Sequence, residues 1–296
     1  MAYPVILGTG RLPDNKKEFY FEEPHEYLIL TCDETVGFVS FRNKEDGSWS
    51  HSPARIDILG SVDLTAGKQN AERTYLEWVL TEEERTSRSY SKRFGKLKIY
   101  RVKACPHRPF TGDKERYNRE PKYAEAIYVT EILGESVPNA FLFGVLDKYK
   151  TPVTMHSDIL GDFLLDKRYG GSWECRCDWL GREIYFSFYD EYDDEGFKEV
   201  IKNAEQMWLD RENWDRKLRE FAAEEMTYLA NDWGENSVNG EITEEEFARR
   251  IQLQGIQILD EGNIDAWFDD GGFFGDHSVT VWGNIFKGLK GASLEG

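Results

Sequence analysis

The sequence is poor in cysteine and lacks long apolar runs. Its four cysteines, Cys32, Cys105, Cys175 and Cys177, are too few and too unevenly placed for a disulfide framework. Nowhere do about eighteen apolar residues follow one another, and no early segment joins a charged start to a continuous apolar run. We therefore expect a protein of the reducing cytoplasm, without a secretion signal and without a membrane partner.

Repeats and familiar catalytic motifs are also missing. The absence of an internal repeat argues against solenoids and propellers. There is no Gly-x-Ser-x-Gly, no His-Glu-x-x-His and no Walker lysine motif, and the Gly8-x-Gly10 pair has Pro13 where a dinucleotide fingerprint needs glycine. These absences weaken the case for an enzyme without closing it, and we expect no cofactor.

Charge is abundant but unevenly distributed. The formal net charge of −18 favours a basic protein partner over nucleic acid or an anionic membrane. Residues 85–122 nevertheless carry thirteen Arg or Lys against three acids, whereas residues 190–246 carry nineteen acids and six bases. The basic segment either binds an external anion or contacts the chain's own acidic half, and its candidate anion ligands are Arg101, Lys103, Arg108 and Arg116.

The first half of the chain alternates in the manner of short strands. Runs such as "EYLILTC", "ARIDILGSVDL" and "GKLKIYRVKAC" are apolar or alternating and are separated by turn-forming residues. Thr81 and Glu84 have the spacing of a capping box, and a second helix is expected over about 139–149. We predict a β-rich domain with short helices over residues 1–155.

The second half combines strands with a long amphipathic helix. "FLLDKRY", "SWECRCDW" and "REIYFSFY" read as strands. After them, apolar residues spaced by three and four from Glu195 to Asn231 predict one amphipathic helix, and the pattern allows a break near 210–213. Three more strands are expected at about 250–259, 263–269 and 277–285. The pattern predicts an α+β architecture over residues 156–296, with two layers and a mostly antiparallel sheet of about six strands. One long helix is expected to pack on this sheet through Phe197, Val200, Ile201 and Ala204.

Several of these segments resemble a known bacterial family. The runs "LGDFLLDKRYGGSWECRCDWLGREIYFSF", "AEQMWLDRENWDRKLREFAAEEM" and "WFDDGGFFGDHSVTVWGN" are similar to domain-of-unknown-function family 2262, over about residues 158–296. The resemblance implies an α+β domain and brings no established activity.

The turn at 269–277 is the stretch most like a site. Strand alternation puts His277 on the core side and Asp269 on the opposite side. Asp270 and Asp276 are placed to orient the His277 ring, as in a ligand-binding or acid/base site. We favour the alternative that this stretch is turn chemistry, in which the glycines matter more than solvated carboxylates.

A second candidate site is a zinc site made of two i, i+2 pairs. Cys105 with His107 and Cys175 with Cys177 supply ligands that suit zinc. The spacing is unlike the usual zinc knuckle, and the pairs fall in different predicted domains. We therefore expect buried structural thiols and no metal.

The sequence favours a non-catalytic binding or interaction protein with an acidic surface. Its composition parallels that of toxin-neutralising immunity proteins, and this parallel is an analogy of composition. The alternatives are an enzyme or small-ligand-binding protein that uses the 269–277 turn, and a zinc-binding protein. The sequence leaves the oligomeric state open.

Overall fold

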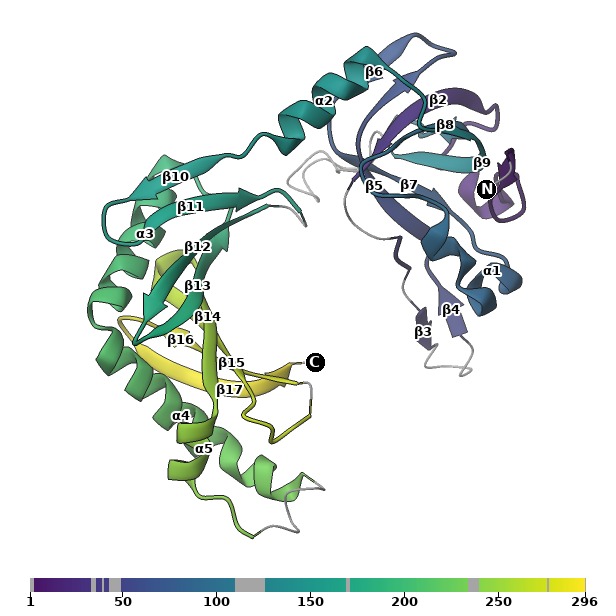
Figure 1. Ribbon diagram of the computed structural model, residues 1–296. Coiled ribbons are helices and arrows are strands. Elements are labelled where there is room, and N and C mark those ends of the chain that lie inside the picture. The colour runs from purple at the N-terminus through teal and green to yellow at the C-terminus, as the bar shows by residue number, and fades with distance from the viewer. Residues whose placement is uncertain are drawn as a thin grey trace. The chain divides into compact units, whose positions relative to one another are not determined.

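The computed structural model describes residues 3–32, 36–38, 40–42, 49–109, 126–168, 171–233, 240–275 and 277–295. Contacts within the chain divide it into two units, Met1–Thr151 and Pro152–Gly296. Figure 1 shows sheets and helices in both units, so the α+β class predicted from the sequence is confirmed.

Five strands of the N-terminal unit close into a barrel. They pair in the ring β9-β7-β5-β2-β8, and β8 pairs back to β9. The pair β7–β9 is parallel and the other four pairs are antiparallel. The strands are β2 (His25–Thr31), β5 (Ala54–Asp63), β7 (Thr74–Trp78), β8 (Ile99–Pro106) and β9 (Ile127–Glu135). Closure leaves these strands without free edges.

Shorter elements surround the barrel. They are β1 (Val5–Ile6) beside β9, β6 (Lys68–Asn70) beside β5, the hairpin of β3 (Ser40–Arg42) and β4 (Trp49–His51), and the helical segments η1 (Asp14–Lys16), α1 (Glu82–Ser87), η2 (Ser89–Lys92) and α2 (Ala140–Lys150). The predicted capping box is present at α1, where Thr81 Oγ1 accepts from the Glu84 N–H. Asn139 caps α2 in the same way.

The strand β2 is buried on both of its faces. Ile29 lies in the barrel interior, whereas Leu28 and Leu30 lie in a second cluster with Leu142 of α2. This explains why the sequence of β2 is continuously apolar instead of alternating.

The C-terminal unit is built on one sheet of eight strands in chain order. They are β10 (Thr154–Ser157), β11 (Gly161–Asp166), β12 (Ser172–Trp179), β13 (Arg182–Tyr189), β14 (Gln252–Ile258), β15 (Asn263–Asp269), β16 (Ser278–Asn284) and β17 (Gly288–Glu295). The predicted number of six was wrong. The two strands missed, β10 and β17, are edge strands with few buried residues, so their sequences carry little apolar signal.

All neighbouring strands of this sheet are antiparallel except β13 and β14, which are parallel. The connection between them contains α3 (Asp194–Leu209), α4 (Arg211–Asp232) and α5 (Glu244–Arg250), and a short η4 (Asp260–Gly262) follows β14. The long helical region is two helices. The break that the sequence allowed near 210–213 lies at Asp210, which leaves helical geometry with φ −105° and ψ 28°.

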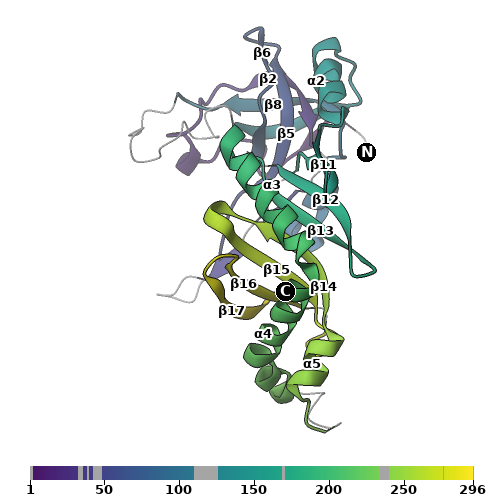
Figure 2. The same cartoon turned by 90° about the vertical axis from the view of Figure 1, so that its left-hand side faces the viewer.

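Helices α3 and α4 cover one face of the sheet, and α5 packs against α4, as Figures 1 and 2 show. Val200 and Ala204 of α3 are fully buried in one cluster with Phe186 and Phe188 of β13. Phe197 and Ile201 pack against the same cluster. The predicted packing of this helical stripe on the sheet is confirmed.

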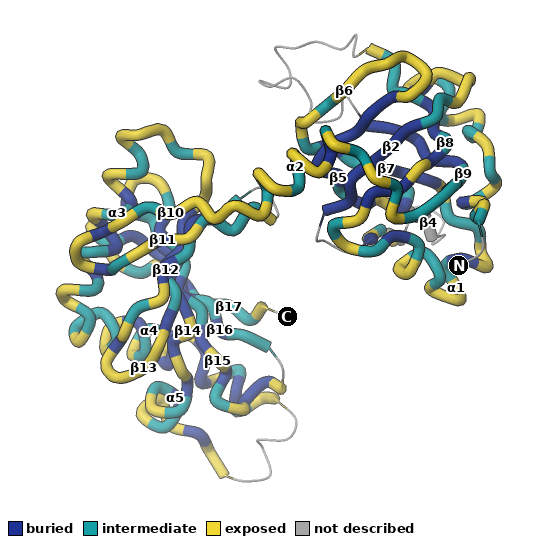
Figure 3. The backbone as a smooth tube through the Cα atoms, turned by 45° about the horizontal axis from the view of Figure 1, so that its top comes forward, coloured by how far each residue is buried: buried dark blue, intermediate teal, exposed yellow. Residues whose placement is uncertain are grey.

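Buried residues follow the strands in each unit (Figure 3). The largest cluster contains only residues of the C-terminal unit, and the two others contain only residues of the N-terminal unit. Each unit thus has a hydrophobic core of its own, which is the property that lets a domain fold alone.

We expect residues 1–151 and 152–296 to fold when they are expressed separately. Each fragment keeps its complete core, so each should show a cooperative thermal transition and native-like dispersion of its amide resonances. A fragment that stays unfolded in buffer would show that its core needs the other half of the chain.

Candidate functional site

Asp270 holds the 269–277 turn together from inside. The residue is only 7% exposed. One carboxylate oxygen accepts the Gly272 N–H at 2.8 Å and the other accepts the Phe274 N–H at 2.6 Å. The expectation of a solvated carboxylate here was wrong, because the turn folds its own backbone donors around Asp270.

His277 also contacts the backbone of this turn. Its Nδ1 lies 2.8 Å from the Phe274 carbonyl oxygen, and its ring meets Trp233 edge-on with centroids 5.6 Å apart. Asp269 accepts the Gly271 N–H at 3.0 Å. Asp276, the third candidate, lies outside the described residues.

The four residues of the zinc candidate fall in different units, Cys105 and His107 in the first and Cys175 and Cys177 in the second. Burial raises the pKa of Cys105 to about 11 and that of Cys177 to about 12, which favours the thiol over the thiolate that zinc binds. Across the described ranges, no three His, Cys, Asp or Glu side chains are grouped so that they could hold a metal ion.

The described part of the basic segment finds its partners within the barrel unit. Arg101 pairs with Glu26 of β2, and Lys103 pairs with Glu131 of β9 at 3.0 Å. Arg108 donates to two backbone carbonyls, of Lys17 and Tyr20, and stacks on the Phe21 ring. Arg116 is outside the residues that the structure describes.

The two units differ sharply in charge. Residues 1–151 carry 23 basic and 23 acidic residues, whereas residues 152–296 carry 14 basic and 32 acidic residues. The entire net charge of −18 therefore comes from the C-terminal unit.

The face of the C-terminal sheet opposite α3 and α4 carries flat aromatic side chains. We call it the uncovered face, because no helix among the described residues of this unit packs on it. Trp267 of β15 is paired with Gly255 of β14, and Trp282 of β16 is paired with Gly291 of β17. Each indole lies so close over its glycine that an added Cβ would collide with the ring. Trp282 is 38% exposed. Both rings therefore lie across neighbouring strands instead of standing up from the sheet.

Carboxylates lie on the same face. Asp265 of β15 is the register partner of Trp282. The pKa of Asp265 is raised above its usual value, mainly by burial and to a smaller extent by the Glu295 carboxylate. Within the described part of the chain the Asp265 carboxylate has no hydrogen-bond or ion-pair partner. The face thus joins flat aromatic rings to an uncompensated negative charge.

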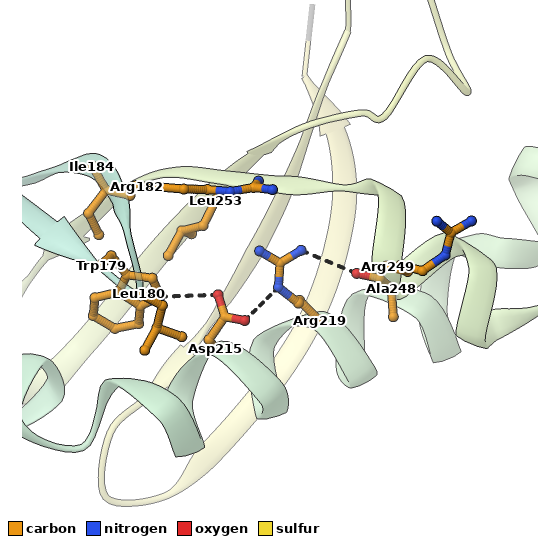
Figure 4. A pocket seen from close by; sticks show the side chains of 9 residues that line it. All are labelled: Trp179, Leu180, Arg182, Ile184, Asp215, Arg219, Ala248, Arg249 and Leu253. Carbon is orange, nitrogen blue, oxygen red and sulfur yellow. Dashed lines mark hydrogen bonds and ion pairs between the residues drawn. The ribbon is translucent and has the colours of Figure 1, made fainter.

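A pocket of about 260 Å³ lies elsewhere in the same unit, between the β12–β13 turn, α4, α5 and β14 (Figure 4). Arg219 and Asp215 of α4 line one side of it. The Arg219 Nε donates to Asp215 at 2.6 Å, and the other Asp215 oxygen accepts from Trp179 Nε1 at 3.1 Å. The pocket is lined by Trp179, Leu180, Arg182, Ile184, Asp215, Arg219, Ala248, Arg249 and Leu253.

Sequence reasoning missed both the uncovered face and the pocket. The alternation of β15 and β16 already separates Trp267 and Trp282 from the apolar residues of their strands, and this was the available signal. The pocket left no such signal, because its arginines come from three elements far apart in the chain.

The C-terminal unit is defined by these observations as a two-layer α+β domain with helices on one face of its sheet. Residues 157–294 match the family DUF2262, described as an uncharacterized protein conserved in bacteria, which confirms the resemblance seen in the sequence. Residues 15–149 match a second family, DUF7021, a domain of unknown function.

No curated protein matches the chain. Among the described residues, none of the helices is long and apolar enough to cross a bilayer. The two family matches carry no activity, so a functional assignment has to come from the surfaces described above.

We predict that both the carboxylate and a glycine of the 269–277 turn are needed for stability. Asp270→Asn removes one of two backbone hydrogen bonds at a buried site and should cost about 1–3 kcal/mol of unfolding free energy. Gly271→Ala should cost about 1 kcal/mol or more, because φ is +65° and the new Cβ meets the Arg250 backbone at 3.0 Å.

Gly275→Ala is the matched control in urea denaturation. Its φ is +64°, but a Cβ there meets nothing within 4 Å, so it should cost less than Gly271→Ala. An Asp270→Asn protein as stable as wild type would show that the two backbone bonds carry no net stabilisation.

Proposed function

We propose that the protein is a non-catalytic binding protein, and that the uncovered face of the C-terminal sheet binds a basic protein segment. One observation carries the proposal. Trp267 and Trp282 lie flat on this face, and Asp265 of β15 lies beside Trp282 of the neighbouring strand. Both Asp270 oxygens accept backbone N–H groups, which favours a structural role for the 269–277 turn over catalysis there.

The chemistry of this face fits lysine and arginine side chains. A cation is attracted to the face of an aromatic ring, most strongly to tryptophan. The long apolar stems of Lys and Arg pack against flat rings while their charged ends reach nearby carboxylates. Asp265 is held near Trp282 and has a raised pKa, so a bound cation would relieve the cost of its charge.

The charge of the unit supports the same partner. With 14 basic and 32 acidic residues, its field accelerates encounter with cationic surfaces and disfavours anionic ones. A basic cytoplasmic protein, of the kind that immunity proteins neutralise, is the partner class that this combination fits.

We predict that a fluorescent oligolysine peptide binds the protein and that the binding depends on this face. Trp282→Ala and Asp265→Asn should each weaken binding about tenfold, since a partly desolvated cation–π or charge contact contributes about 1–2 kcal/mol. Binding should also weaken as salt is added.

Glu224→Gln is the matched control, because it removes one carboxylate from the exposed surface of α4 on the helical side. It should leave the affinity within about twofold of wild type. If it weakens oligolysine binding as much as Asp265→Asn does, the peptide senses only the overall field and the proposed face is wrong.

We further predict that Asp265→Asn stabilises the protein at neutral pH. The pKa of the Asp265 carboxyl is higher in the folded protein than in the unfolded chain. The wild-type protein therefore loses stability as the pH rises from the unfolded-state pKa through the folded-state pKa. The variant should be more stable than wild type at pH 7, by less than about 1 kcal/mol because solvent screens this site.

The difference should vanish near pH 3, below the ordinary aspartate pKa of about 3.9. Urea denaturation at both pH values measures it. A variant less stable than wild type at pH 7 would mean that Asp265 has a stabilising partner, and would remove the argument that it is kept for binding.

A further inference from the structure

We infer that the pocket beside α4 and α5 binds a small organic anion through a carboxylate or phosphate group. Three arginines, Arg182, Arg219 and Arg249, are among the residues that line this cavity of about 260 Å³, against the single carboxylate of Asp215. In Figure 4 the guanidinium groups of Arg182 and Arg219 face the same space, whereas the exposed Arg249 side chain extends away from it. This site is separate from the uncovered sheet face, and the inference does not rest on the proposed function.

Arg219 is held ready for a ligand by its own contacts. Its Nε donates to Asp215 at 2.6 Å, and its Nη1 donates to the carbonyls of Ala248, at 3.2 Å, and Ile251. In Figure 4 the remaining terminal nitrogen points into the space beneath the end of Arg182. A fixed guanidinium loses little conformational freedom when it binds, which favours affinity.

Arg182 and Arg249 are exposed, and the guanidinium group of neither has an ion-pair or hydrogen-bond partner in the part of the chain that the structure describes. This is unusual in a unit where acids outnumber bases 32 to 14. A guanidinium group binds two oxygens of a carboxylate or phosphate at once through two parallel N–H groups. Arginines that line the same pocket therefore favour a ligand with one of these groups.

The rest of the lining limits the size and character of the ligand. Leu180, Ile184 and Leu253 form an apolar wall beside Trp179. The volume lies below the range of about 300–1,000 Å³ typical of drug-sized ligands. A compact molecule with one anionic group and a small apolar body matches both features.

A purely structural role accounts for only part of the pocket. Asp215 and Arg219 tie α4 to Trp179 of β12 and to the end of α5, and they would be needed without any ligand. Arg182 and Arg249 make no such ties within the described residues, so a structural role leaves them unexplained. They are therefore the residues to change.

The test is calorimetric titration of the full-length protein with phenyl phosphate, and separately with benzoate. We expect saturable binding of at least one probe, weakened about tenfold or more in Arg182→Gln/Arg249→Gln. Arg216→Gln is the matched control, since Arg216 is an exposed arginine of α4 that does not line the pocket; its affinity should equal that of wild type. The two probes separate a phosphate site from a carboxylate site.

The indole N–H resonance of Trp179, assigned with Trp179→Phe, gives a second measurement on the wild-type protein. It should shift on titration, because this group donates to Asp215 in the pocket wall. The inference is overturned if neither probe binds wild type in the millimolar range, or if Arg216→Gln weakens binding as much as the double variant. It is also overturned if binding leaves the Trp179 resonance unmoved, and this holds even if the double variant fails to fold.

Discussion

The parallel pairing of β13 with β14 is the constraint on which the C-terminal unit depends. Tyr185, Phe186 and Ser187 pair in parallel with Gly255, Ile256 and Gln257. Parallel neighbours cannot be joined by a tight turn, so the chain must cross back over the sheet between them. That crossover contains α3, α4 and α5; α3 and α4 pack on one face of the sheet, and α5 packs on α4. Within the described residues of this unit no helix packs on the opposite face, and the pocket forms where the crossover returns to β14.

The tryptophans of the uncovered face serve the sheet as well as a partner. A glycine in a strand leaves backbone unprotected, and a cross-strand aromatic ring covers it. Trp267 over Gly255 and Trp282 over Gly291 do this at two places in the sheet. Asp265 has no such structural explanation, because its raised pKa marks a carboxylate whose charge costs stability where it lies.

Local sequence patterns predicted the elements that carry a strong local signal. Alternation located β12 and β13, and the turn between them uses Leu180 and Gly181 with φ of 55° and 82°, as a two-residue hairpin turn requires. The edge strands were missed because they bury little. Barrel closure was missed because it depends on the parallel β7–β9 pair and the β8–β9 pair, which no local pattern specifies.

The candidate sites were harder to predict than the fold. Asp270 was expected in solvent because turn carboxylates usually are, yet this one is buried by the backbone it holds. Residues of the pocket meet only after the crossover has folded, so nothing in their local sequence relates Arg182 to Arg219 or Arg249.

Mapping amide chemical shifts of the full-length protein during an oligolysine titration tests the central claim most directly. Binding on the uncovered face predicts the largest changes in β15, β16 and β17, around Trp267 and Trp282. Changes centred on the acidic surfaces of α3 and α4, or spread evenly over all the acidic residues, would contradict the account.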